Sequence, residues 1–200
     1  MDYAELLSAI ESWTGDTFDA NQRKQFVALA EAEFNRRLRT LDMEVRAVAT
    51  LNGDYLALPD DFLKLRAIQI GNILLEPATP QFIRERKAWS GEPRYYAITD
   101  GQIQFFPVPN DSYDVEIIYF RKIPALSDTN TTNWLIESHP DLYLFRSLAF
   151  AETFGWNDPR AAGFGAAAQT IMEQINEQEK GRRLGAQPIK MSRPLNAPRN

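Results

Sequence analysis

Acidic side chains cluster at one point of the sequence where paired carboxylates could serve acid–base or metal chemistry. Asp60 and Asp61 are adjacent, and Asp54 lies a few residues earlier. Two neighbouring carboxylates can exchange a proton with a substrate or bind a hard metal ion. Pro59 comes directly before the pair, however, and acidic residues at such a position commonly cap and solubilise a turn. We therefore interpret these residues as part of a turn and not as a catalytic site.

The single histidine is the other candidate for acid–base chemistry. His139 and Asp141 are two positions apart in the expected first turn of a helix, where such side chains do not face each other. Ser138 would need a histidine partner that it has no room to meet, and no nucleophile-elbow, Walker-type or dinucleotide-binding motif is present. Gly163-Phe164-Gly165 falls within a helical pattern, which favours close helix packing over phosphate binding. The sequence therefore predicts that the protein is not an enzyme.

Composition limits the possible cofactors and compartments. The chain has no cysteine and one histidine, which excludes disulfides, thiol catalysis, cysteine-ligated zinc and a multi-histidine metal site within one chain. No run approaches the roughly 18 apolar residues of a membrane span, and two early acids stand where a secretory signal has basic residues. We therefore expect no cofactor, no metal and no membrane partner.

Charge is distributed unevenly along the chain. The net charge is −5, yet residues 181–200 hold five cationic residues and no acid, so the first 180 residues carry −10. An acidic body disfavours binding to duplex DNA, because affinity for DNA comes largely from neutralising phosphates. The basic segment could still contact DNA or order as an extended peptide in the groove of an acidic partner.

Aromatic residues in the expected strands offer a second route to nucleic acids, because aromatic rings can stack on bases. No lysine or arginine is interleaved with them on the same face, so packing in the core of a sheet explains them better. The residues concerned are Tyr95, Tyr96, Phe105, Phe106, Tyr113, Tyr119 and Phe120.

Apolar residues at helical spacing predict two helices at the start of the chain. The first covers residues 2–13, and the second covers about 19–38 and begins with a capping box over residues 19–22. Glu31 and Glu33 fall on the charged side of the second helix. We expect that side to face solvent or, in an oligomer, a neighbouring subunit.

The stretch 126–154 contains the helix around which the chain is organised. Ser138 and Pro140 mark its expected start, and Gly155 marks its expected end. The helix is apolar on most of its circumference, so we expect other elements to surround it. A further helix is expected over residues 158–180, with a face of small residues that packs on the core helix or on a neighbouring subunit.

Between the helices, the periodicity of the apolar residues changes to two, which is typical of half-buried strands. Residues 52–54 and Asp100-Gly101 have the composition of hairpin turns, and Gly71-Asn72 predicts a third turn. A last long strand is expected over residues 113–120. The stretch 43–124 therefore predicts a small antiparallel β unit inserted between helices.

These elements together predict an α+β fold, in which an α-helical bundle carries the inserted antiparallel β unit and an extended C-terminal tail. The expected divisions are residues 1–42 for the N-terminal helices, 43–124 for the β insertion, 125–180 for the core helix and the last helix, and 181–200 for the basic tail.

The order of these parts resembles that of phage head-to-tail adaptor proteins, the connector or tail tubular protein A-like proteins of tailed phages. The resemblance covers residues 1–180 and rests on core and turn residues without a catalytic signature. It is carried by Leu56-Ala57-Leu58-Pro59-Asp60-Asp61-Phe62, Gly91-Glu92-Pro93-Arg94-Tyr95-Tyr96-Ala97-Ile98, Ile117-Ile118-Tyr119-Phe120, Asn133-Trp134-Leu135 and Pro140-Asp141-Leu142-Tyr143-Leu144.

The resemblance implies a structural protein of the virion, located at the head–tail junction and assembled in the host cytoplasm. Proteins of this family form a ring, usually of twelve subunits, beneath the portal protein ring and extend the DNA channel toward the tail. The β part is then expected to face the next tail component, a nozzle or a tail tube or stopper protein. By position and composition, the expected portal-binding residues are Arg182, Arg183, Leu184, Pro188, Ile189, Met191, Arg193 and Leu195.

An acidic body also suits a channel through which double-stranded DNA must slide without specific binding, because negative charge repels phosphates. Glu173, Glu177 and Glu179 on the last helix are the expected channel-facing residues. The alternative function is that of another tail or packaging structural protein whose basic tail contacts DNA. Salt-dependent DNA binding by the isolated protein distinguishes the two, since an adaptor is expected to bind DNA weakly.

Overall fold

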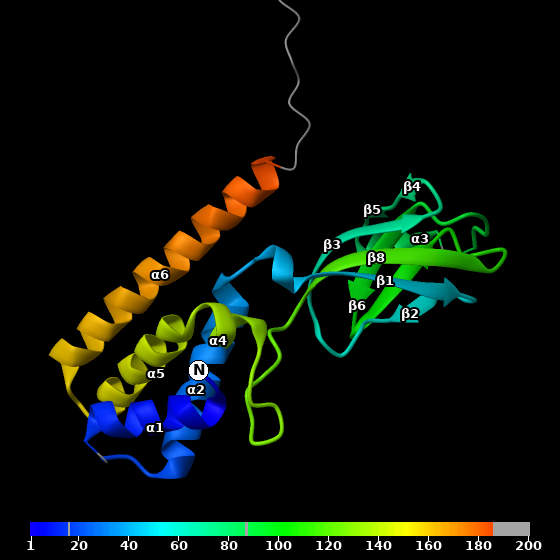
Figure 1. The fold of residues 1–200 in the computed structure, drawn as a ribbon. Coiled ribbons are helices and arrows are strands. Elements are labelled where there is room, and N and C mark those ends of the chain that lie inside the picture. The colour runs from blue at the N-terminus through cyan, green and yellow to red at the C-terminus, as the bar shows by residue number, and fades with distance from the viewer. Residues whose placement is uncertain (16, 87, 186–200) are drawn as a thin grey trace, which may run out of the picture.

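The chain folds into a helical part and a β part that are visibly separate (Figure 1). The computed structural model describes residues 1–15, 17–86 and 88–185. The β part comprises residues 44–121, and the helical part is formed by the segments before and after it. The expected mixture of helix and sheet is confirmed.

The helical part is built around α5, as the apolar pattern predicts. Its elements are α1 (Tyr3–Thr14), α2 (Ala20–Arg37), the short 3-10 helix η1 (Leu41–Met43), α4 (Trp134–Ser138), α5 (Pro140–Phe154) and α6 (Asp158–Gly185). Helix α5 contacts α1, α2, α4 and α6. Leu142, Tyr143 and Leu148 of α5 are fully buried in the core that these helices share. Burial of these large apolar side chains is what stabilises the assembly of helices.

The first two helices begin at capping boxes that the sequence encodes. Asp2 accepts a hydrogen bond from the Glu5 amide, and the Glu5 side chain accepts one from the Asp2 amide. Asp19 and Gln22 make the same reciprocal pair at the start of α2. Each box satisfies backbone amides that have no partner within the first turn. The helix start predicted at residues 19–22 is confirmed.

Two helix boundaries differ from those expected. Ser138 ends the short helix α4 and does not cap α5, whose preceding residue is His139 and makes no side-chain capping bond. Helix α6 continues to Gly185 instead of ending at Lys180. Arginines in its last turn favour this extension, because positive charge stabilises the negative end of the helix dipole. Residues 181–185, which follow Lys180, therefore belong to α6.

Close packing at the glycines of α6 is not observed. A side-chain carbon added at Gly163 would meet no atom within 4 Å, and one added at Gly165 would meet only Nη1 of Arg146, at 3.7 Å. The face of α6 that contacts the core carries the fully buried small residue Ala168 together with Met172 and Ile175, so the expected packing of this face on α5 is confirmed. Gly163 and Gly165 themselves are not a point of close contact between helices within the described subunit.

The β part consists of two small sheets. Its strands are β1 (Glu44–Leu51), β2 (Tyr55–Ala57), β3 (Phe62–Ile70), β4 (Ile73–Leu74), β5 (Glu76–Pro77), β6 (Tyr95–Thr99), β7 (Gln102–Phe106) and β8 (Tyr113–Arg121), and the short helix α3 (Pro80–Glu85) lies between β5 and β6. One sheet has the order β1-β8-β3-β4 and the other the order β2-β7-β6-β5. All pairs are antiparallel except β5 with β6, which is parallel.

The turn residues predict two hairpins correctly and one wrongly. Asp100 and Gly101 adopt positive φ angles of 53° and 71° and join β6 to β7, and Gly71 turns β3 into β4. Residues 52–54 connect β1 to β2, but these strands lie in different sheets, because β1 pairs with β8 and β2 pairs with β7. Residues 52–54 therefore form a turn that connects one sheet to the other. The pairing of β1 with β8, more than sixty residues away, is not visible in a local pattern.

One bulky residue has a backbone conformation that side chains rarely adopt. Trp156, in the turn between α5 and α6, has a φ angle of 59° and a relative exposure of 91%. The left-handed region costs residues other than glycine about 1–2 kcal/mol because the Cβ atom approaches the following carbonyl. The indole buries too little surface to offset this cost, so the fold holds Trp156 in a strained position.

We expect the Trp156→Gly variant to be about 1 kcal/mol more stable than the Trp156→Ala variant, because both lose the indole and only glycine tolerates this φ angle. Denaturant unfolding of the two variants measures the difference. The matched control is the same pair of changes at Gln178, an exposed residue inside α6. There glycine should be the less stable by about 1 kcal/mol. Equal stability of the two Trp156 variants would contradict the proposed strain.

Candidate docking surface

The residues expected to bind a partner begin on α6 and continue beyond the described chain. Arg182, Arg183 and Leu184 lie in the last turn of this helix. Pro188, Ile189, Met191, Arg193 and Leu195 lie outside the described residues. The structure therefore shows where the basic segment starts.

Arg182 and Arg183 fasten the end of α6 to the rest of the protein. Nη1 of Arg182 lies 2.5 Å from a Glu179 oxygen and 3.4 Å from an Asp42 oxygen. Nη2 of Arg183 donates a 3.0 Å hydrogen bond to the carbonyl of Arg39, and its guanidinium lies 5.5 Å from the centre of the Phe120 ring. The sequence predicts that these two arginines belong to an extended tail, but they lie in the last turn of α6. They fix the point from which the last residues depart.

The three glutamates expected to face a channel are not equivalent. Glu173 and Glu177 are exposed on α6, whereas Glu179 is only 6% exposed. A carboxylate oxygen of Glu179 accepts a 2.7 Å hydrogen bond from the amide of Leu41, at the start of η1. Glu179 therefore faces inward and connects α6 to the segment that leads into β1.

A buried carboxylate of α2 organises the loop between β8 and α4, here called the linking loop (residues 122–133). Glu31 is 7% exposed, and its Oε1 atom accepts hydrogen bonds from the Leu126 amide, at 2.8 Å, and from the Tyr143 hydroxyl, at 3.2 Å. Asn133 donates to the same hydroxyl, at 2.8 Å. Burial raises the pKa of Glu31, and the two donors counteract this. The pKa of Tyr143 is raised by burial and by the Glu31 charge.

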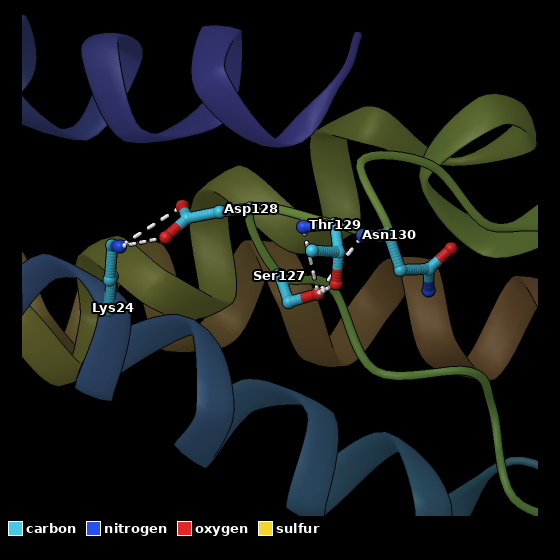
Figure 2. Close-up of polar contacts among 5 residues, drawn as sticks. All are labelled: Lys24, Ser127, Asp128, Thr129 and Asn130. Carbon is cyan, nitrogen blue, oxygen red and sulfur yellow. Dashed lines mark hydrogen bonds and ion pairs between the residues drawn. The ribbon is translucent and has the colours of Figure 1, made fainter.

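The surface of the linking loop is held by an ion pair and a local turn (Figure 2). Nζ of Lys24, on α2, lies 3.0 and 2.7 Å from the two carboxylate oxygens of Asp128. Oγ of Ser127 accepts a 3.0 Å hydrogen bond from the Asn130 amide, which closes the turn around Asp128. At the other end, Asn35 accepts a 2.8 Å hydrogen bond from the Ile123 amide. The linking loop is thus attached along the length of α2.

A second buried carboxylate of α2 connects three helices. Glu33 is 5% exposed and forms ion pairs with Arg146 of α5 and Arg37 of α2, the latter at 2.9 Å. Arg37 also donates to Gln169 of α6. The expectation that Glu31 and Glu33 lie on a solvated face is therefore wrong. The two donors to Glu31, and the Arg146 partner of Glu33, are more than 90 residues away along the chain, so a local pattern does not mark these glutamates as buried.

The residues considered for catalysis serve structural roles. Asp61 accepts a 2.8 Å hydrogen bond from the Tyr119 hydroxyl, and the Asp60 carbonyl accepts one from Lys122. His139 precedes α5 without making a side-chain cap. Within the described ranges, no three acidic or histidine side chains form a group able to hold a metal ion.

The aromatic residues of the strands pack inward, as expected. Phe105, Phe106, Tyr119 and Phe120 are buried, and Tyr95, Tyr96 and Tyr113 are half-buried. These rings contribute to the cores of the β part and to its junction with the helices, so they form no exposed platform for bases. No helix among the described residues is long and apolar enough to cross a membrane.

A sequence model of the SU10 adaptor protein family matches residues 1–194. The chain therefore belongs to the SU10 adaptor protein family. A search of curated proteins found no match.

Membership of this family makes the chain a structural adaptor protein of a phage. Such an adaptor is a virion component of the head–tail junction and associates there with the portal and the tail. The family is not an enzyme family.

Replacing Tyr143 by Phe should lower the free energy of unfolding by about 1–3 kcal/mol, because Glu31 and Asn133 each lose a buried hydrogen-bond partner. The control is Tyr113→Phe, which removes a hydroxyl that donates to Asn110 at the surface. That change should stay within about 0.5 kcal/mol. Urea denaturation measures both. A loss of similar size in the two variants would contradict the role of the Glu31 contacts.

Glu179→Ala should destabilise the protein by about 2 kcal/mol, because it leaves the Leu41 amide without its acceptor and removes the shorter of the two ion pairs of Arg182. Glu177→Ala removes the same charge from the same helix, but Glu177 is exposed and pairs with the exposed Lys180, at 2.5 Å. We expect that change to cost less than about 0.5 kcal/mol. Thermal unfolding followed by circular dichroism compares them. If Glu177→Ala is the more destabilising, Glu179 does not anchor α6 as described.

Proposed function

We propose that this chain is a connector of the tail tubular protein A-like type, which assembles as a ring of about twelve copies beneath the portal. In this position it extends the DNA channel and provides a docking platform for the tail. The observation that carries the proposal is the family match over residues 1–194, which includes both parts of the fold. A ring is the arrangement in which one small adaptor can meet a ring-shaped portal at equivalent positions.

The two parts suit two different contacts. The helical part contains α6, from whose end the basic residues depart, so we assign it to the ring and to the portal. The β part extends to the other side of the junction formed by η1 and the linking loop (Figure 1). We assign the β part to the next tail component, a nozzle or a tail tube or stopper protein.

The basic segment is assigned to portal contact, with a division of roles among its residues. Arg182 and Arg183 are engaged by Glu179 and Arg39, so they hold the start of the segment in place. The residues assigned to the portal itself are Leu184, Pro188, Ile189, Met191 and Leu195, together with Arg193. A peptide with apolar residues and prolines among cations suits an extended conformation in a groove.

Of the three glutamates expected to face the channel, Glu179 is buried, and we no longer assign it to the channel. Glu173 and Glu177 remain as exposed acids on α6, and we propose that they face the passing DNA. With −10 over the first 180 residues, the body repels phosphates. The double-stranded genome would then pass through the lumen without specific binding.

Light scattering of the protein alone, of the portal ring and of their mixture tests the proposal. The mixture should gain the mass of about twelve copies on a twelvefold portal ring. A variant that ends at Gly185 keeps all of α6 and its contacts, so it should remain folded and lose most of its affinity for the portal. Full binding by this variant would overturn the role of the last residues. If the intact protein never joins the portal but binds duplex DNA, a packaging role replaces the connector role.

A further inference from the structure

The end of α6 and the end of α2 enclose a cleft with a surplus of positive charge. Its volume is about 330 Å³, and its lining residues are Arg37, Arg39, Asn176, Glu179, Lys180 and Arg183. Four of these six side chains are cationic and one is acidic, although the body as a whole is strongly acidic. We propose that this cleft, here called the α2–α6 cleft, binds the carboxylates of an acidic protein segment from a docking partner.

Two of the four cations are already neutralised within the protein. Arg37 pairs with Glu33 at 2.9 Å, and Lys180 pairs with Glu177 at 2.5 Å. Glu179, the one acid in the lining, accepts from the Leu41 amide and from Arg182. The surplus charge therefore resides on the remaining pair of arginines.

Arg39 and Arg183 have no carboxylate within ion-pair distance among the residues that the structure describes. Nη1 of Arg39 donates to the carbonyls of Asn35, at 2.7 Å, and Leu38, while its Nη2 and Nε atoms make no hydrogen bond there. Arg183 uses Nη2 to reach the Arg39 carbonyl, and its Nε atom is buried without a partner. Partial burial lowers the pKa of Arg39, as it does for a cation that lacks a counter-ion.

Stabilisation of helix ends accounts for only part of this arrangement. Arg39 follows the C-terminus of α2, where a cation is favourable and where its bonds to the Asn35 and Leu38 carbonyls satisfy the last turn. A guanidinium has five N–H donors in a planar fork that matches two carboxylate oxygens. Both arginines retain several of these donors, so each can still bind a carboxylate.

The surroundings of the cleft favour a protein carboxylate over duplex DNA. Glu173 and Glu177 are exposed on the same helix and repel a long polyanion. A cleft of about 330 Å³ between two helices admits a few side chains but not a duplex, whose major groove alone is about 12 Å wide. A single acidic side chain is small enough to enter the α2–α6 cleft despite the negative charges of Glu173 and Glu177.

The protein's own last residues are poorly suited to fill the cleft. Residues 186–200 contain Lys190, Arg193 and Arg199 and no acid, so they add positive charge where negative charge is required. We therefore assign the occupant to another molecule. Because the cleft lies at the root of the basic segment, a partner that receives this segment would bring its acids to the cleft.

Fluorescence anisotropy with the full-length protein and a short labelled peptide that holds two Glu residues among Ala residues tests the proposal. The peptide should bind at low salt, and Arg183→Gln should weaken it about tenfold, the loss expected for one charge-assisted hydrogen bond. Arg183→Lys, which keeps the charge but loses the fork, should fall between the two. The control is Arg94→Gln, which removes an exposed arginine that pairs with Glu92 in the β part and should leave the affinity unchanged.

Arg39→Gln should have an effect at least as large as Arg183→Gln, and circular dichroism establishes whether it folds. If it does not, Lys180→Gln replaces it, since this change leaves Glu177 unpaired beside the cleft, and the added negative charge should weaken peptide binding severalfold. Absence of peptide binding, or an equal loss in Arg94→Gln, would overturn the proposal. Tighter binding of duplex DNA than of the peptide, reduced by the same variants, would show a phosphate site instead. None of these measurements involves the portal, so their failure is separate from failure of the proposed function.

Discussion

Two carboxylates of α2, Glu31 and Glu33, are the constraint on which the helical part depends. A buried carboxylate is unfavourable unless hydrogen bonds and opposite charges replace its water. Glu31 is satisfied by the linking loop and by Tyr143, and Glu33 by Arg37 and Arg146. Loss of one of these partners leaves a buried carboxylate with fewer groups to replace its water. The pair therefore specifies how α5 and the linking loop lie on α2, beyond what apolar packing alone would fix.

A buried carboxylate also lies where the helical part meets the β part. Glu179 ties α6 to η1, directly before the chain enters β1, and Arg183 lies against Phe120 near the end of β8. The position of the β part and the departure point of the basic segment are thus set by one group of contacts. For an adaptor between two assemblies, this coupling would keep the two proposed contact regions in a fixed relation. The α2–α6 cleft lies within this region and retains unused donors.

Local patterns in the sequence predict the elements well and their distant partners poorly. The capping box of Asp19 and Gln22 and the Asp100-Gly101 turn are satisfied by residues a few positions away, so both are readable from sequence. The burial of Glu31 depends on Leu126 and Tyr143, which only the folded chain brings near. The sequence predicts an end of the last helix at Lys180, where its regular spacing of apolar residues stops, whereas contacts of Arg182 and Arg183 hold a further turn up to Gly185. Family resemblance, and not composition, led to the adaptor function.

Hydrogen exchange of the full-length protein, free and mixed with the portal ring, tests the central claim most directly. The claim is that the end of α6 and the residues after it form the portal contact while the β part remains available for the tail. The account predicts slower exchange in α6 and in residues 186–200 on mixing, with the amides of β1 to β8 unchanged. Protection confined to the β part would contradict the account, because it would place the portal on the opposite side of the molecule.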